Sequence, residues 1–103
     1  MPILLDYQNR EVRLTEEWLA HILDHPEMVG MEAQTADTLK QPKLVHQSRS
    51  DESVALLYQF YTQTAIGYRW LCVVVKYLPD DAFVVTAYFT DKSKRGETLW
   101  QSE

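Results

Sequence analysis

The chain has 103 residues, of which 46% are hydrophobic and 24% are charged, a composition typical of one ordinary globular domain spanning residues 1–103. The sequence has no signal-peptide pattern, and no apolar run reaches the roughly 20 residues of a membrane helix. The single Cys72 excludes an internal disulfide. We therefore expect a cytoplasmic protein that does not span a membrane. The net charge of −5 argues against nucleic-acid binding unless a local basic patch makes the contact.

The N-terminal part of the sequence predicts a short strand followed by two helices. Glu11–Leu14 alternates polar and apolar residues, as a half-buried strand does. Thr15 suits an N-cap and Trp18 and Ile22 repeat at helical spacing, which predicts a first helix that ends at His25, before Pro26. We expect a second helix from about residue 27 to residue 40. Its weaker apolar face would consist of Met28, Met31, Thr35, Thr38 and Leu39.

From Lys43 onward the apolar period changes from 3.6 to 2, the period of β-strands. The pattern predicts four strands and a short edge strand or tail, at residues 43–48, 54–61, 68–78, 82–90 and 98–100. Leu71–Val75 is a continuous apolar run, typical of a central strand. These elements predict an α+β domain, with two N-terminal helices packed on one face of a four- to five-stranded antiparallel sheet.

Strand alternation predicts hydroxyl groups and a lysine on one face of this sheet. In residues 82–90 the positions expected to face the helices are Phe83, Val85, Ala87 and Phe89. The positions expected on the opposite face are Val84, Thr86, Tyr88 and Thr90. Lys76 of the preceding strand should lie near Thr86 and Tyr88, where these groups could bind a phosphate. A solvated sheet face, with Lys76 simply ending its strand, explains the same pattern.

Two histidines four residues apart, His21 and His25, fall on one side of the first predicted helix. The spacing suits two zinc ligands, but the candidates for a third ligand, His46, Cys72 and Asp24, have no motif around them. An acid–base role in catalysis fits the pair as well, as does a structural hydrogen bond at the helix end. Without a clear third ligand, we expect no metal and no other cofactor.

A basic cluster, Lys92-Ser93-Lys94-Arg95, follows the last long strand. Lys92, Lys94 and Arg95 are the best local candidates for contacts with the phosphate backbone of RNA. A solubilising hairpin loop accounts for the cluster equally well.

Five blocks of the sequence carry a resemblance to a known family. They are RLTEEWLAHILDHPEM at residues 13–28, TLKQPKLV at 38–45, LLYQFY at 56–61, LCVVVK at 71–76 and FVVTAYFTDK at 83–92. In this order the blocks resemble the phage-type branch of the barnase–EndoU–colicin–RelE nuclease fold, as do similar blocks in small cyanobacterial proteins of unknown function. The resemblance implies N-terminal helices on a four-stranded antiparallel sheet. It also implies metal-independent cleavage of RNA by side chains around the open sheet face, with His21, His25, Lys76, Thr86 and Tyr88 as the catalytic candidates.

Three functions therefore stay open at this point. The first is a small metal-independent endoribonuclease, toxin-like or related to phage defence, with RNA as substrate and a small antitoxin or immunity protein as a possible partner. The second is a non-catalytic module of the same fold that binds a protein or RNA. The third is a protein that binds a metal through His21 and His25.

Overall fold

The computed structural model describes residues 3–15, 20, 32–64, 67–90 and 97–101. In chain order its elements are β1 (Ile3–Leu5), β2 (Glu11–Leu14), α2 (Glu32–Lys40), β3 (Leu44–Gln47), β4 (Val54–Thr64), β5 (Gly67–Leu78), β6 (Asp81–Thr90) and β7 (Glu97–Gln101). Within these ranges, no helix is both long enough and apolar enough to cross a membrane.

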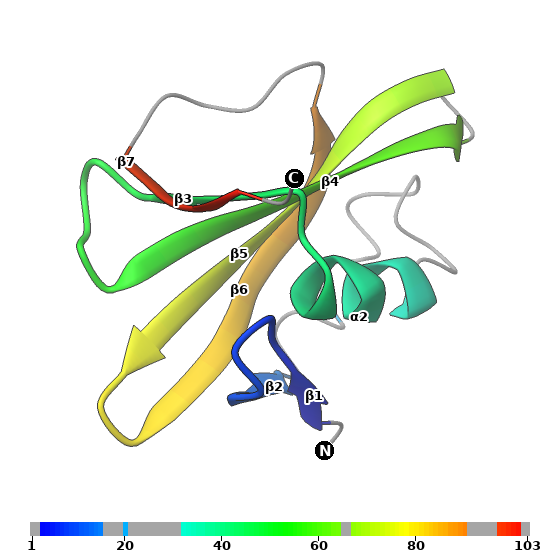
Figure 1. Ribbon diagram of the computed structural model, residues 1–103. Helices are drawn as coiled ribbons and strands as arrows, with labels where there is room; N and C mark the ends of the chain where they lie inside the picture. Colours follow the sequence, from blue (N-terminus) through cyan, green and yellow to red (C-terminus); the bar gives the residue numbers. More distant parts are fainter. Residues whose placement is uncertain (1–2, 16–19, 21–31, 65–66, 91–96, 102–103) are drawn as a thin grey trace.

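All seven strands belong to one mixed sheet, in the order β1-β2-β6-β5-β4-β3-β7. Neighbouring strands are antiparallel except for β2, which runs parallel to β6. Figure 1 shows the long strands β4, β5 and β6 running through the middle of the sheet, with α2 lying against one face close to the β1–β2 hairpin. The N-terminal hairpin thus extends the sheet next to a strand from the C-terminal half of the chain.

The predicted fold class, two N-terminal helices on a four- to five-stranded antiparallel sheet, is wrong. The sheet has seven strands, one pair of them is parallel, and the described residues contain a single helix with defined bounds, the nine-residue α2. Most of the predicted first helix lies outside the described residues, although Ala20 is helical. The strands predicted from residue 43 onward are confirmed to within three residues at each end, and so is the short strand at Glu11–Leu14.

The unpredicted strand β1 is joined to β2 by a turn that Asp6 organises. The Oδ1 atom of this buried carboxylate accepts hydrogen bonds from the backbone amides of Gln8 (2.8 Å) and Arg10 (2.9 Å). Asn9 has a φ of 62°, in the left-handed region that asparagine tolerates better than most residues. The turn residues therefore fold Ile3–Leu5 back onto β2, although three apolar residues are too few to reveal a strand by alternation.

The main hydrophobic core lies between the sheet and α2. Leu39 is fully buried, as are Thr35 and Thr38 on the same side of the helix, so the predicted apolar face is confirmed at these three positions. The helix contacts β1, β4 and β5. The buried members of this core are Val12, Leu14, Leu39, Val45, Ala55, Leu57, Leu71, Val73, Val75, Ala82, Val84 and Ala87.

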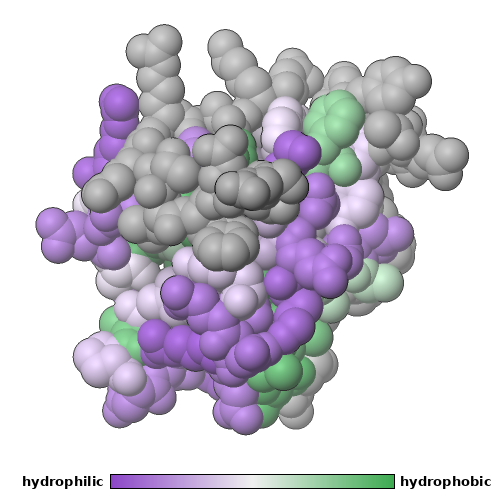
Figure 2. Space-filling model, in the orientation of Figure 1, coloured by the Kyte–Doolittle hydropathy of each residue, from purple (hydrophilic) through white to green (hydrophobic). Residues whose placement is uncertain are grey.

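Large apolar side chains are exposed at a few places among the described residues. They are Ile3 (54% exposed), Leu5 (46%), Phe60 (41%) and Val85 (47%). On the side of the molecule drawn in Figure 2, most coloured residues are hydrophilic and the hydrophobic ones form small, separate patches. Scattered apolar residues of this kind are normal on protein surfaces, so exposure alone does not mark a binding site.

Candidate functional site

The sheet face opposite α2 carries a second, smaller cluster of side chains, called here the aromatic face. Its buried members are Leu56, Tyr58 and Cys72, and the half-buried residues packed against them are Leu44, Trp70, Val74 and Tyr88. His46 and Phe60 extend the aromatic face through ring contacts with Tyr58 and Trp70. These residues alternate along β4 and β5 with members of the main core, so the pleat of the sheet separates the two clusters.

Four aromatic rings of this face meet edge to face in a row across β3, β4 and β5. The ring centroids are 5.7 Å apart for His46 and Tyr58, 6.3 Å for Tyr58 and Trp70, and 5.3 Å for Trp70 and Phe60. Tyr58 is fully buried, whereas Phe60 is 41% exposed, so the row runs from the interior to the surface. Its outer end, formed by Trp70 and Phe60, offers ring surface on which a planar group such as a nucleobase can stack.

A β-bulge decides which side chains of β6 reach the aromatic face. Val74 of β5 pairs with Thr86, whereas the next residue, Val75, pairs with Val84. Val85 is therefore an extra residue between the two pairs, and side-chain alternation shifts by one position there.

The bulge overturns the predicted orientation of the first half of β6. Val84, expected on the face opposite the helices, is fully buried in the main core together with Ala82. Phe83 pairs with Lys76 on the opposite face, and Val85 is exposed, although both were expected to face the helices. Beyond the bulge the prediction is confirmed: Ala87 and Phe89 belong to the main core, and Thr86, Tyr88 and Thr90 pair with residues of the aromatic face.

Tyr88 is the predicted site residue that packs directly into the aromatic face. It pairs with Cys72 of β5 and is half-buried. Burial raises the pKa of its hydroxyl far above the ordinary value, and Cys72 and then Tyr58 add to the increase. The phenol therefore keeps its proton at neutral pH and cannot serve as a base, and its hydroxyl is hydrogen-bonded to Cys72.

Lys76 does not lie beside Tyr88 as the sequence predicted. Its partner in β6 is Phe83, whereas the partner of Tyr88 is Cys72. Lys76 and Cys72 are four positions apart along β5, which corresponds to about 13 Å of strand. Thr86 pairs with Val74, two positions before Lys76, so the lysine is a diagonal neighbour of Thr86 but not of Tyr88.

The Lys76 side chain forms an ion pair with Asp51, which belongs to the connection between β3 and β4. Lys76 Nζ donates to Asp51 Oδ2 at 2.7 Å. Asp51 Oδ1 accepts hydrogen bonds from the backbone amide (2.9 Å) and the hydroxyl (2.6 Å) of Ser53. The bond from Lys76, followed by those from Ser53, holds the pKa of the Asp51 carboxyl well below its usual range.

The remaining predicted site residues, His21, His25, Lys92, Lys94 and Arg95, lie outside the described residues, so their roles stay predictions. In the part of the chain that the structure describes, no three His, Cys, Asp or Glu residues come together in a way that could hold a metal ion. The two described candidates for a third metal ligand, His46 and Cys72, both belong to the aromatic face.

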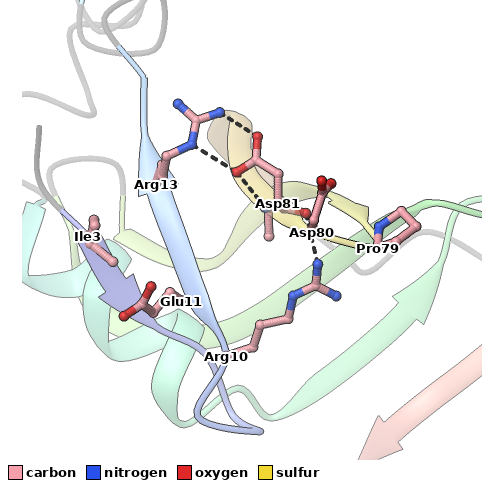
Figure 3. Close-up of a pocket in the computed structure, with 8 residues that line it drawn as sticks. Ile3, Arg10, Glu11, Arg13, Pro79, Asp80 and Asp81 are labelled. Carbon is pink, nitrogen blue, oxygen red and sulfur yellow. Dashed lines mark hydrogen bonds and ion pairs between the residues drawn. The ribbon is translucent and has the colours of Figure 1, made fainter.

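A hollow of about 350 Å³ lies between the β1–β2 hairpin and the β5–β6 turn (Figure 3). Arg13 donates two hydrogen bonds to the Asp81 carboxylate, from Nε to Oδ1 (2.9 Å) and from Nη2 to Oδ2 (2.7 Å). Arg10 Nη2 donates to the backbone carbonyls of Leu78 and Asp81, the latter at 2.8 Å. Both guanidinium groups are thus engaged within the protein, and Glu11 adds a negative charge to the lining. These contacts fit a clamp that holds the hairpin against the turn better than a site for an anionic ligand.

The signals for the aromatic face were present in the sequence only in part. Alternation along residues 54–61 places Leu56, Tyr58 and Phe60 on one side of a strand, and the same reasoning groups Trp70 with Cys72. The sequence of either strand alone does not predict the register in which the two strands pair, so the row of rings was not predicted.

Comparison with known proteins identifies no relative: no protein-family model, no curated protein and no solved structure matches this chain. The resemblance to barnase–EndoU–colicin–RelE nucleases therefore rests on the sequence blocks alone.

Proposed function

We propose that this chain is a small metal-independent endoribonuclease, toxin-like or related to phage defence, that binds RNA on the aromatic face. The observation that most supports the proposal is the combination of exposed ring surface with a protonated phenol on one side of the sheet. Trp70 pairs with Thr90 and Cys72 pairs with Tyr88, so Trp70 and Tyr88 are diagonal neighbours across β5 and β6. Diagonal positions of this kind lie within reach of aromatic side chains. A base stacked on Trp70 would therefore bring the adjoining phosphate close to Tyr88.

The proposed chemistry is attack of a ribose 2′-oxygen on the neighbouring phosphorus. A general base removes the proton of the 2′-hydroxyl, the new P–O bond forms, and the bond to the 5′-oxygen breaks as a general acid protonates that oxygen. The products are a 2′,3′-cyclic phosphate and a free 5′-hydroxyl. By exchanging its hydrogen bond with Cys72 for one to the substrate, the Tyr88 hydroxyl would donate to the phosphoryl oxygens, where negative charge develops. The sequence candidates for base and acid are His21 and His25, because an imidazole titrates near neutral pH.

The test is incubation of the purified chain with a mixed single-stranded RNA pool at low salt in the presence of EDTA. We expect cleavage, with 2′,3′-cyclic or 3′-phosphate ends on the products. At least one of the variants His21→Ala, His25→Ala and Tyr88→Phe should slow cleavage by about 100- to 10,000-fold, the usual contribution of a general acid or base. Trp70→Ala should weaken RNA binding by about 1–3 kcal/mol, the usual contribution of one stacked base.

Tyr61→Phe provides a matched control for Tyr88→Phe. Tyr61 is likewise half-buried, but it lies on β4, packs against the main core, and bonds through its hydroxyl to the Gln34 carbonyl and to Asp37 of α2. This variant should cleave RNA at the rate of the unmodified chain. An RNA pool left intact, or unchanged rates in all three variants, would exclude the ribonuclease.

A non-catalytic binding module is the second candidate, and the ion pair of Lys76 with Asp51 favours it. The pair neutralises a lysine that a nuclease would use against the phosphate charge. Such a module would bind single-stranded RNA, or a protein such as a small antitoxin, without cleaving RNA. Binding that depends on Trp70 and Phe60, with no cleavage under any condition tested, would support this second function.

A further inference from the structure

The contact between Lys76 and Asp51 joins a cation of the sheet to the connection between β3 and β4. Asp51 is three residues before Val54, and the Val54 amide donates to the Asp51 carbonyl at 3.1 Å. Val54 is also the residue of β4 that pairs with Lys76. The side chains of Lys76 and Asp51 are 29% and 42% exposed, so solvent and solutes reach the pair.

This contact turns the lysine charge away from the hydroxyl groups of β6. Lys76 lies between Val54 of β4 on one side and Phe83 of β6 on the other. Asp51 belongs to the β4 side, whereas Thr86 and Tyr88 belong to β6. As long as the ion pair holds, Lys76 Nζ is drawn towards β4 and its charge is already balanced by a carboxylate.

We propose that Asp51 is an autoinhibitory positioning residue, whose carboxylate occupies Lys76 until a phosphate group of bound RNA replaces it. The inference rests on the proposed function, because it assumes that RNA lies on the aromatic face. A phosphate offers the ammonium group a charged acceptor of the same kind as a carboxylate. The exchange is feasible because an ion pair that solvent reaches contributes little to stability.

Asp51→Asn separates the charge of Asp51 from its structural role. The amide oxygen of asparagine can still accept the two bonds from Ser53 that now go to Oδ1. The amide nitrogen that replaces Oδ2 carries no charge and cannot accept a bond from Lys76. Asp51→Ser is a second variant of the same kind, since a serine hydroxyl can also close a turn by accepting a backbone amide.

Glu52→Gln is the matched control. Glu52 is the next residue, it is exposed, and its replacement changes the net charge by the same amount. Lys76→Met, alone and combined with Asp51→Asn, tests whether any effect passes through the lysine. Thermal unfolding of each variant shows which ones are folded and suitable for comparison.

The experiment measures binding of a fluorescent single-stranded RNA oligonucleotide by anisotropy over a series of salt concentrations. Asp51→Asn should bind about two- to fivefold more tightly at low salt, as expected for release of an exposed ion pair. The slope of log K against log salt should become steeper by about 0.7, the value for one counterion released from a single strand, because no displaced carboxylate is left to take up a cation when the phosphate binds Lys76. Glu52→Gln should keep the slope of the unmodified chain. Combining Lys76→Met with Asp51→Asn should abolish the gain in affinity.

The salt slope distinguishes this inference from a structural role of Asp51, because a folding defect does not increase the number of counterions released on RNA binding. If Asp51→Asn and Asp51→Ser both behave like Glu52→Gln, while the unmodified chain cleaves RNA, the inference is wrong and the proposed function stands. A gain that persists in the variant lacking both Asp51 and Lys76 also overturns it. If neither the unmodified chain nor Asp51→Asn binds RNA at any salt concentration, both the inference and the proposed function fail.

Discussion

Removing the hydroxyl of Tyr77 should destabilise the domain, because this hydroxyl donates a hydrogen bond to the buried carboxylate of Asp6. The distance from Tyr77 Oη to Asp6 Oδ2 is 2.9 Å, and burial followed by the charge of Asp6 raises the pKa of the phenol. Tyr77→Phe keeps the ring, over which the Arg10 guanidinium lies at 5.3 Å from the centroid, so little other than the hydroxyl is lost. A hydrogen bond to a charged group contributes about 1.5–3 kcal/mol. For a domain of this size, the loss corresponds to a fall in Tm of about 6–24 °C.

The free energy of unfolding of Tyr77→Phe is measured by urea denaturation followed by circular dichroism. A double-mutant cycle with Asp6→Asn isolates the coupling between the two side chains. Tyr61→Phe serves as the control, since its hydroxyl bonds to a backbone carbonyl and to the exposed Asp37, and its removal should cost only about 0.5–1.5 kcal/mol. A loss below about 0.5 kcal/mol for Tyr77→Phe, or a coupling energy near zero, would refute the view that Asp6 and Tyr77 hold the hairpin to β5.

Two further predictions concern residues of the main core. Leu39→Ala should lower the free energy of unfolding by about 2–5 kcal/mol, because Leu39 is fully buried between α2 and the sheet, and a loss under 1 kcal/mol in urea denaturation would contradict this packing. Burial, with a contribution from Asp37, raises the pKa of Tyr61 to about 12, whereas an unfolded tyrosine titrates near 10. The folded chain therefore holds this proton more tightly, and the associated stability is complete below pH 10 and disappears as the pH rises towards 12. Tyr61→Phe should accordingly lose less stability than the unmodified chain over that interval, and equal losses in urea titrations would contradict the assignment.

The strands from residue 43 onward could be predicted because each is specified locally. Alternation over four to twelve residues identifies β3 to β6, and turn residues such as Pro79 and Asp80 separate them. The rest of the sheet depends on contacts between distant parts of the chain. The parallel pair of β2 and β6 is reinforced by the bidentate contact between Arg13 and Asp81, which are 68 residues apart. No local sequence pattern predicts a pairing between such distant segments. The predicted all-antiparallel sheet of four to five strands was wrong for this reason.

The candidate site was predictable in the same limited sense. Alternation correctly placed Thr86 and Tyr88 on the face opposite the helix, because both follow the bulge and keep a regular register with β5. It also placed Lys76 on that face, but it gave no sign that Asp51, from a turn 25 residues earlier, balances the lysine charge. Alternation describes the orientation of a backbone, but the partner of a long charged side chain depends on which loops fold next to it.

The extra residue Val85 explains how β6 can both pair with β2 of the N-terminal hairpin and contribute a side chain to the aromatic face. Before the bulge, Val84 pairs with Leu14 of β2, and both are buried in the main core. Phe83, on the other side of the strand, lies under the Arg13 guanidinium at 5.6 Å from the ring centroid. With unbroken alternation, Val84 would share a face with Tyr88 and leave the core that it now shares with Leu14. The bulge therefore lets β6 bury Val84 beside the N-terminal hairpin while presenting Tyr88 to the aromatic face.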